Sequence, residues 1–310
     1  MKTWKWAGTM LLLVLAIACK ERGKKEAAAS RAHVFTPVTV PLTYTDPRQR
    51  AEYLAAHFWD HFDFTDTAFI HLPEVTEQAF AGYMKALTSV PRAKAAASVK
   101  KMLEEAGREG RVLHYFAGLY EKYLYDPNSP VMNEELYIPV LETIVGSGAF
   151  DEADQARAVH RLEMALKNRL GSRATDFSFT LASGKKMRLH DIKTEYTLLF
   201  FNNPGCQACK LYRDAMCASA MLARLIRENR LKVVAIYPDE DLAGWKEYRP
   251  LIPGEWLNGY DEALALREQK LYSLRAIPSL YLLDKEKTVL LKDAPFELVE
   301  QYLIAVTAPS

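Results

Sequence analysis

The sequence predicts two folded regions of different class, an all-helical region followed by an α/β region. Apolar residues recur at helical spacing from Asp46 to about Leu170, whereas short alternating or continuous apolar runs, typical of strands, begin after Gly171. The second region orders its elements as strand, helix and strand, followed by a hairpin and a helix, which is the order of an α/β fold. A length of 310 residues agrees with about two domains.

The helical region starts at the pair Asp46-Pro47, where a capping side chain precedes a proline at the first helical position. Loops rich in proline or glycine interrupt the helical pattern at 126–130 and 146–148. Helices are expected before the first break at 76–87, 92–106 and 111–125, between the two breaks at 133–145, and after the second at 151–168.

Two histidines of the first helix, His57 and His61, are four residues apart and would share one helix face. With Asp60 and Asp63 nearby, they could hold a metal ion. The aromatic residues around them favour a packed amphipathic helix instead. The sequence therefore predicts no metal site here.

The α/β region is expected to open with a hairpin whose strands, 177–181 and 187–189, flank the turn Ser183-Gly184-Lys185. A continuous apolar run at 196–201 predicts a buried central strand. The other expected elements are a helix from about Cys206, a strand at 231–237, a helix at 242–248, an insert at 255–258, a helix at 261–270, strands at 279–284 and 288–291, and a helix at 295–305.

The composition is that of a soluble globular protein, with 49% hydrophobic and 25% charged residues. The formal net charge of +1 gives no reason to expect nucleic acid as a partner.

The first residues have the pattern of a secretory signal. Lys2 and Lys5 precede an apolar run from Ala7 to Ala18, and about a dozen residues are too few for a span that needs roughly 20. The chain around Cys19 resembles a bacterial lipobox, which implies cleavage after Ala18 and lipidation of Cys19. An ordinary secretory signal, in which Cys19 has no role, is the alternative.

Only four cysteines occur, Cys19, Cys206, Cys209 and Cys217, which are too few for a disulfide-scaffolded protein. Cys206 and Cys209 form a C-x-x-C pair where the buried strand gives way to a helix. The free N–H groups and partial positive charge of a helix N-terminus favour a thiolate over a thiol. We therefore expect Cys206 to be the attacking nucleophile and Cys209, one turn later, to be the resolving thiol.

Other interpretations of the cysteine pair fit less well. A zinc site needs about four ligands, and the chain has no second pair. A C-x-x-C bridge closes too small a loop to stabilise a fold much. A peroxiredoxin-like site would have the arrangement Pro-x-x-x-Thr-x-x-Cys, and its threonine is missing before Cys206. Cys217 would lie about 12 Å from Cys209 on one helix, beyond disulfide reach, so we expect it to be buried as a small apolar residue.

A second element that favours redox chemistry lies about seventy residues downstream, where Ile277-Pro278 precedes a predicted strand. X-Pro bonds can be cis, and a cis proline facing the cysteines would leave the backbone of Ile277 free to pair with an extended substrate. An ordinary trans proline at a strand edge is the alternative. The acidic run Asp239-Glu240-Asp241 is explained by capping of the next helix and is left out of the site.

With these motifs, the region from about Gly171 to Ala305 resembles the TlpA-like, membrane-anchored thioredoxin-like oxidoreductases. The resemblance implies a thioredoxin fold and dithiol–disulfide exchange outside the cytoplasm, with no cofactor other than a redox-active Cys206–Cys209 disulfide. Two positions depart from the family pattern: Gly205 replaces a tryptophan, and Gln207-Ala208 replaces Gly-Pro, which leaves the redox direction open. The matching residues are Ala174-Thr175-Asp176-Phe177, Ser183-Gly184-Lys185, Leu189-His190-Asp191, the cysteine pair, the insert before Leu271, and Ile277-Pro278.

The helical region resembles a domain of unknown function that precedes thioredoxin-like domains in envelope lipoproteins, which implies an architecture but no activity. The residues that carry this resemblance are 57–64, 123–130 and 134–137.

Together these patterns predict an all-α domain followed by an α/β thioredoxin-like fold. The expected divisions are a signal peptide at 1–18, a flexible tether at 19–45, the all-α domain at 46–170 and the thioredoxin-like domain at 171–310. The expected function is a lipid-anchored, non-cytoplasmic thiol–disulfide oxidoreductase of the cell envelope, with envelope protein thiols or disulfides and an upstream electron donor as partners. A partner-binding lipoprotein without catalysis and a thiol peroxidase are the alternatives.

Overall fold

The structure, a computed structural model, describes residues 33–308 of the chain. The expected signal peptide and the lipidation site Cys19 lie outside the described residues. The chain forms two compact units, one ending at Val159 and one beginning at His160, and the helix α7 (Glu152–Ala165) contributes residues to both. No helix among residues 33–308 is long and apolar enough to cross a membrane.

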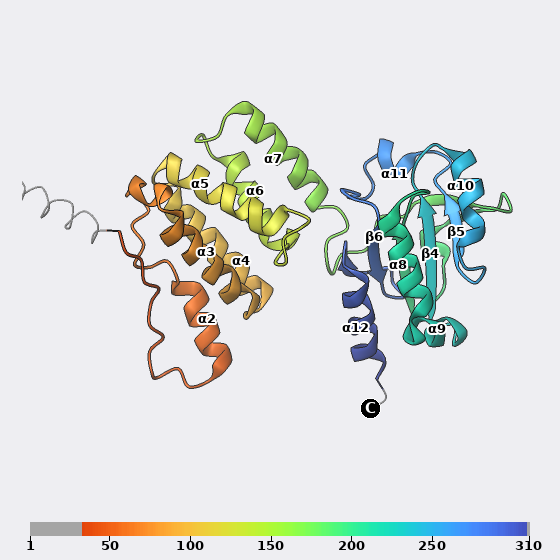
Figure 1. The fold of residues 1–310 in the computed structure, drawn as a ribbon, viewed down its shortest axis with the longest axis horizontal. Helices are drawn as coiled ribbons and strands as arrows, with labels where there is room; N and C mark the ends of the chain where they lie inside the picture. Colours follow the sequence, from red (N-terminus) through yellow and green to blue (C-terminus); the bar gives the residue numbers. More distant parts are fainter. Residues whose placement is uncertain (1–32, 309–310) are drawn as a thin grey trace, which may run out of the picture. The chain divides into compact units, whose positions relative to one another are not determined.

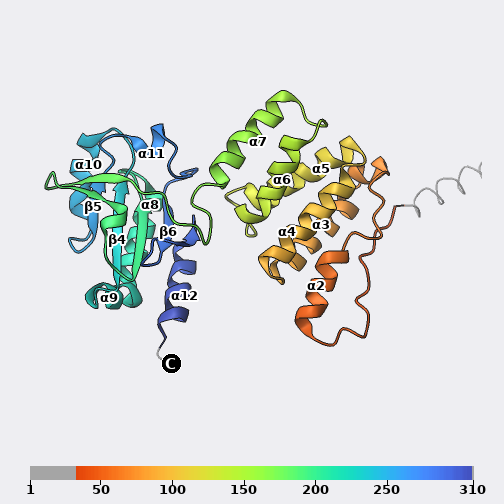
Figure 2. The same cartoon turned by 180° about the vertical axis from the view of Figure 1, so that it is seen from behind.

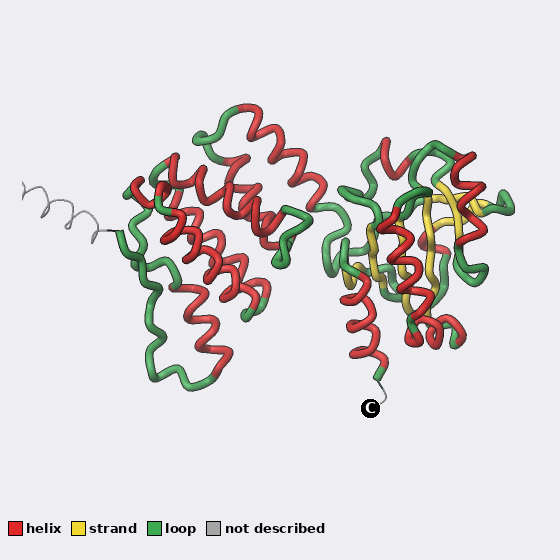
Figure 3. The backbone as a smooth tube through the Cα atoms, viewed as in Figure 1, coloured by secondary structure: helices red, strands yellow, loops and turns green. Residues whose placement is uncertain are grey.

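Every regular element described in the first unit is helical, as predicted (Figures 1 and 3). The helix α4 has the predicted bounds, whereas the region predicted as one helix at 111–125 consists of α5 followed by a single π-helical turn, η2. The elements before α7 are α2 (Pro47–His57), η1 (Thr67–His71), α3 (Pro73–Thr88), α4 (Arg92–Ala106), α5 (Gly110–Tyr120), η2 (Glu121–Tyr125) and α6 (Glu134–Gly146).

Capping side chains define where two of these helices begin. The Asp46 carboxylate accepts a 2.9 Å hydrogen bond from the backbone N–H of Gln49, and Pro47 takes the first helical position of α2. Asn133 caps α6 in the same way, with a 3.1 Å bond from the N–H of Leu136. Each cap satisfies an N–H group that has no partner inside its helix.

The helix α2 is shorter than predicted, because it ends at His57 and the chain turns over the following residues. The prediction that His57 and His61 share a helix face was therefore wrong. The His57 ring instead lies with its Nδ1 2.6 Å from an Asp60 oxygen. The turn releases Phe58, Trp59 and Phe62 from helical spacing and directs all three into the core, where they are buried.

The core of the first unit is unusually rich in aromatic rings. Phe116 is fully buried. The centroid of its ring lies 5.4 to 6.1 Å from the ring centroids of four other aromatic residues, Trp59, Phe62, Phe64 and Phe80. Most of these pairs are tilted or edge-to-face, the arrangements that aromatic quadrupoles favour. Burial of such large side chains is the main stabilisation of this unit.

Residues before α2 also pack on this cluster. The Phe35 ring stacks on Trp59 with centroids 5.1 Å apart, and His33 Nε2 lies 3.1 Å from an Asp66 oxygen. From His33 onward, the residues predicted to belong to the tether are thus held against the helical unit. Contact between the Phe35 ring and the aromatic rings of the helical unit explains this packing.

The second unit contains a seven-stranded mixed sheet with strand order β2-β1-β5-β4-β3-β6-β7 (Figures 1 and 2). The central strands β3, β4 and β5 are parallel to one another, and the remaining pairs are antiparallel. The strands are β1 (Ser178–Leu181), β2 (Lys186–Arg188), β3 (Tyr196–Phe201), β4 (Leu231–Tyr237), β5 (Leu257–Tyr260), β6 (Ser279–Leu283) and β7 (Val289–Lys292). The helices are η3 (Leu189–Asp191), α8 (Gln207–Ala218), α9 (Ala220–Arg227), α10 (Leu242–Tyr248), η4 (Arg249–Leu251), α11 (Ala265–Glu268) and α12 (Phe296–Thr307).

The strand β3 is buried on both faces, which explains its continuous apolar sequence. Leu198 and Phe200 face a cluster that includes residues of α8, α9 and α12, whereas Leu199 and Phe201 face a second cluster on the other side of the sheet. Figures 1 and 2 show α8 and α12 covering the same face. The alternation follows from the two-residue period of a strand.

Three elements of the second unit differ from the prediction. The expected insert at 255–258 is partly the strand β5, and the helix expected at 261–270 is limited to the single turn α11. The helix after Cys206 breaks at Ser219, because the Ser219 hydroxyl caps the separate helix α9 through a 3.1 Å bond from the N–H of Leu222.

Candidate active site

A tight turn connects the central strand β3 to the cysteine pair. The backbone N–H of Cys206 donates a 3.4 Å hydrogen bond to the carbonyl of Asn203, and the residues between them are Pro204 and Gly205. Gly205 has a φ of 72°. Proline in the second position and a positive φ in the third are the features of a type II turn. The glycine that replaces the family's tryptophan therefore has a conformational role, since it lets the chain reverse directly before the first cysteine.

The turn places Cys206 at the N-cap of α8. Its Sγ accepts a 3.0 Å hydrogen bond from the N–H of Cys209, and the two residues form a disulfide with Cα atoms 5.2 Å apart. Cys206 is partly exposed, whereas Cys209 is fully buried in the core beneath it. The accessible sulfur is thus the one that lies at the positively polarised end of the helix.

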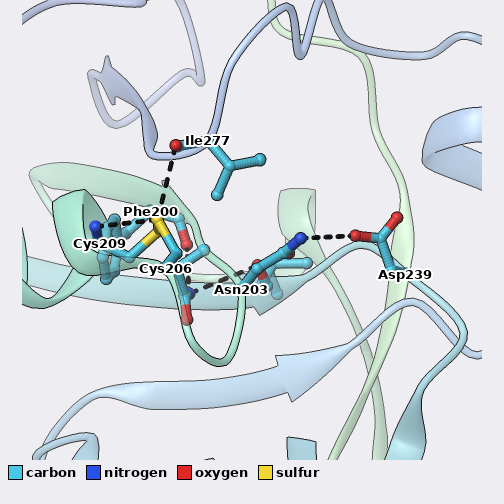
Figure 4. The surroundings of a disulfide bond; sticks show 8 residues. Phe200, Asn203, Cys206, Cys209, Asp239 and Ile277 are labelled. Carbon is cyan, nitrogen blue, oxygen red and sulfur yellow. Dashed lines mark hydrogen bonds between the residues drawn. A yellow bond between two sulfur atoms is a disulfide. The ribbon is translucent and has the colours of Figure 1, made fainter. Parts of the chain in front are cut away.

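The Ile277–Pro278 peptide bond is cis and lies beside the disulfide. The Ile277 carbonyl oxygen is 3.6 Å from Cys206 Sγ (Figure 4). The next residue, Ser279, begins β6, which pairs with β3 through Phe201. The two sequence-predicted parts of the site, which are about seventy residues apart in the chain, are therefore in contact.

Sequence reasoning missed a second loop at the site. Asn203 donates a 2.7 Å hydrogen bond from Nδ2 to Asp239 Oδ2 (Figure 4). Asp239 follows β4, whereas Asp241 has the role expected for the acidic run and caps α10 through a 3.0 Å bond from the N–H of Gly244. Only part of the signal was present in the sequence: Asn203 and Asp239 follow the strands predicted at 196–201 and 231–237, but the pairing of those strands was not predicted.

Two further residues, Lys210 and Cys217, follow the pair on α8, and the backbone N–H of Lys210 donates a 3.1 Å hydrogen bond to the carbonyl of Cys206. Lys210 follows Cys209 and its side chain is exposed. Cys217 lies on α8 with Cys209, as predicted, and is not disulfide-bonded. The prediction that Cys217 is buried was wrong, because α8 turns Cys209, Arg213 and Met216 towards the core and Cys217 is exposed.

Among residues 33–308, no group of three or more His, Cys, Asp or Glu side chains could hold a metal ion.

Comparison with known proteins agrees with this architecture. A thioredoxin-like protein from Bacteroides caccae, of known crystal structure, is 45% identical to the chain with a TM-score of 0.84, and the alignment covers 88% of this chain and 99% of that one. The chain belongs to the thioredoxin-like proteins. Its residues 18–168 also match the family model of a domain of unknown function, DUF5106.

Shorter solved structures match part of this chain. The C-terminal domain of an uncharacterised protein from Bacteroides fragilis is 53% identical, with a TM-score of 0.43, and covers 44% of this chain and 97% of its own. A domain of a possible thiol-disulfide isomerase from Cytophaga hutchinsonii is 25% identical, with a TM-score of 0.38, and covers 46% of this chain and 95% of its own. A comparison with curated protein sequences gave no match.

Proposed function

We propose that the protein is a thiol–disulfide oxidoreductase that exchanges electrons through Cys206 and Cys209. The observation that carries the proposal is the position of Cys206 Sγ, which is partly exposed and accepts the N–H of Cys209 at the start of α8. This N–H and the helix dipole stabilise a negative charge on the sulfur once the disulfide is reduced. The contact between the Ile277 carbonyl oxygen and Cys206 Sγ and the membership of the thioredoxin-like family support the same chemistry.

In the proposed reaction the reduced protein donates two electrons to a substrate disulfide. The Cys206 thiolate attacks one substrate sulfur, forms a mixed disulfide and releases the other substrate sulfur as a thiolate. Cys209, deprotonated, then attacks Cys206 Sγ, which releases the second substrate sulfur and forms the Cys206–Cys209 disulfide seen in the structure. An external dithiol donor reduces this disulfide again, so electrons and protons balance over the cycle.

The backbone beside the cis bond supports a role in substrate binding. With the Ile277 carbonyl 3.6 Å from Cys206 Sγ, a peptide that places its own cysteine on this sulfur would extend along residue 277. An extended segment of another protein is therefore the expected substrate, bound through its main chain at Ile277 and Pro278. We further propose that these substrates are cell-envelope proteins and that lipid on Cys19 anchors the enzyme there, on the basis of the amino-terminal sequence pattern.

The test is reduction of an accessible protein disulfide, such as those of insulin, by the purified protein with a dithiol donor. We expect Cys206→Ser to abolish the activity and Cys209→Ser to accumulate a mixed disulfide with substrate. Cys217→Ser is the matched control, since this exposed cysteine of the same helix is unpaired, and it should retain full activity. Full activity in Cys206→Ser would show that the assignment is wrong.

The same purified protein tests the two alternatives. Rapid consumption of hydrogen peroxide that depends on Cys206 would favour a thiol peroxidase. Specific capture of an envelope protein by the full chain with both Cys206 and Cys209 replaced by serine, together with an inactive wild type, would favour a binding module.

A further inference from the structure

A hydrogen bond joins the loop after β3, which leads to Cys206, to the loop after β4. The strands β3 and β4 are parallel neighbours paired from Tyr196 to Phe201, so both end at the same edge of the sheet. The first residues beyond that edge include Asn203 after β3 and Asp239 after β4. Their 2.7 Å hydrogen bond joins an amide to a carboxylate in a part-buried setting, where a charge-assisted bond is stronger than a neutral one.

Asn203 uses different groups to contact Asp239 and Cys206. Its side-chain amide donates to Asp239, and its backbone carbonyl accepts the N–H of Cys206 that closes the turn. The Oδ1 atom of Asn203 is buried and has no hydrogen-bond partner among the described residues. Within the described part of the chain, Asp239 is thus the group that orients this side chain, as Figure 4 shows.

The turn from Asn203 to Cys206 leads directly to the reactive sulfur, Cys206 Sγ. Cys206 Sγ lies 3.0 Å from the Cys209 backbone nitrogen, and hydrogen bonds weaken steeply when this geometry is disturbed. We propose that Asn203 and Asp239 are positioning residues of the redox site, which hold Cys206 against the start of α8 and thereby tune the reduction potential of the cysteine pair. This inference rests on the proposed function and adds to it the part that controls its potential.

The connection has two effects of opposite sign on a Cys206 thiolate. The hydrogen bond keeps the sulfur where the helix N-terminus stabilises it, whereas the negative charge of Asp239 opposes a second anion nearby. Substitutions separate the two effects. Asn203→Ala removes the hydrogen bond and retains the charge, while Asp239→Asn removes the charge and retains an oxygen that can accept from Asn203.

The experiment equilibrates the purified full chain with graded mixtures of reduced and oxidised glutathione and measures the oxidised fraction by thiol alkylation. With the thiolate less stabilised, Asn203→Ala should make the pair easier to oxidise, with the exchange equilibrium shifted about tenfold, which corresponds to about 30 mV. Asp239→Asn should shift the equilibrium the opposite way. In the reduced protein, the pH at which Cys206 ionises, followed by thiolate absorbance, should rise in Asn203→Ala and fall in Asp239→Asn.

Asp241→Asn is the matched control, because it removes a carboxylate from the same loop and still supplies a side chain that can cap α10. It should leave the equilibrium unchanged. If Asn203→Ala does not fold, Asn203→Ser, which also lacks the amide, takes its place. A wild-type pair that never exchanges with glutathione would contradict the proposed function itself. A wild-type pair that exchanges, together with an Asn203 variant of unchanged potential and unchanged ionisation, would overturn only the positioning role.

Discussion

The two units bury their apolar residues in different ways, and the cysteine pair lies in the second of them. In the helical unit, the buried Phe116 ring lies at the centre of a cluster of aromatic rings. In the thioredoxin-like unit, the sheet core continues to its own edge, so that the buried Cys209 belongs to the core and the part-exposed Cys206 lies at the surface. Where parallel strands end, the loops that follow them and the N-terminus of the next helix come together at one edge of the sheet. The core of a helical bundle has no such edge.

This contrast predicts that the stability of the first unit and the redox chemistry of the second can be altered separately.

The largest expected effect is loss of the aromatic cluster. Phe116→Ala removes a fully buried ring and should lower the free energy of unfolding by about 3–5 kcal/mol, measured by chemical denaturation followed by circular dichroism. The reduction potential of the cysteine pair, measured in the fraction that remains folded, should not change. The control is Leu42→Ala, because Leu42 is 90% exposed and its loss should cost less than about 0.5 kcal/mol. A changed potential in Phe116→Ala would contradict the separation of the units.

Sequence patterns predicted the elements that an apolar period defines. The helix α4 and the strands β3 and β4 have the predicted bounds, because each is long enough to repeat its own burial pattern. The strand β5 was missed because its four residues carry little pattern and pair only once β1 and β4 are in place. Its Gly259 is explained only in three dimensions, where a Cβ atom would lie 2.7 Å from the Phe179 ring.

The site divides in the same way. The cysteine pair and Ile277-Pro278 are local motifs that could be recognised one at a time, and the structure brings them into contact. The bond between Asn203 and Asp239 depends on β3 and β4 being parallel neighbours, which no local pattern states. The prediction that Cys217 is buried was wrong. It relied on the residue type, since cysteine is usually buried, whereas Cys217 lies on the solvent-facing side of α8.

The second effect concerns a buried amine in the thioredoxin-like unit, outside the contacts of the cysteine pair. Lys287 is 2% exposed, and its Nζ has no hydrogen-bond partner among the described residues. Burial lowers the pKa of this amine, and the positive charge of Lys193 lowers it further. The folded protein therefore binds fewer protons than the unfolded chain between this lowered pKa and the ordinary value of 10.5, so stability should rise with pH across that window.

Lys287→Met keeps the aliphatic part of the side chain and should stabilise the protein near neutral pH by about 1–3 kcal/mol, because no unpaired amine is then buried. The rise of stability towards alkaline pH should also shrink. Lys285→Met is the control in the same turn, since its side chain is 72% exposed and it should change stability by less than about 0.5 kcal/mol. Equal denaturation midpoints for wild type and Lys287→Met at neutral and alkaline pH would show that the buried amine carries no cost.

The smallest expected change in stability distinguishes two turns of the same unit. Gly184 in the β1–β2 hairpin and Gly205 before Cys206 have φ values of 81° and 72°, and a Cβ atom added to either would meet nothing within 4 Å. Alanine at each position should therefore cost a similar amount, about 1 kcal/mol, through backbone conformation alone. Thermal denaturation of the two variants measures this cost.

The redox readout should differ between the two variants although their stability should not. Gly205→Ala strains the turn that delivers Cys206 Sγ to the Cys209 N–H, so we expect its rate of disulfide exchange to fall several-fold. Gly184→Ala strains a turn that contacts neither cysteine and should exchange at the wild-type rate. If both variants lose the same exchange rate, the effect is one of general stability. If neither does, the geometry of the turn before Cys206 is not what presents the sulfur to its substrate.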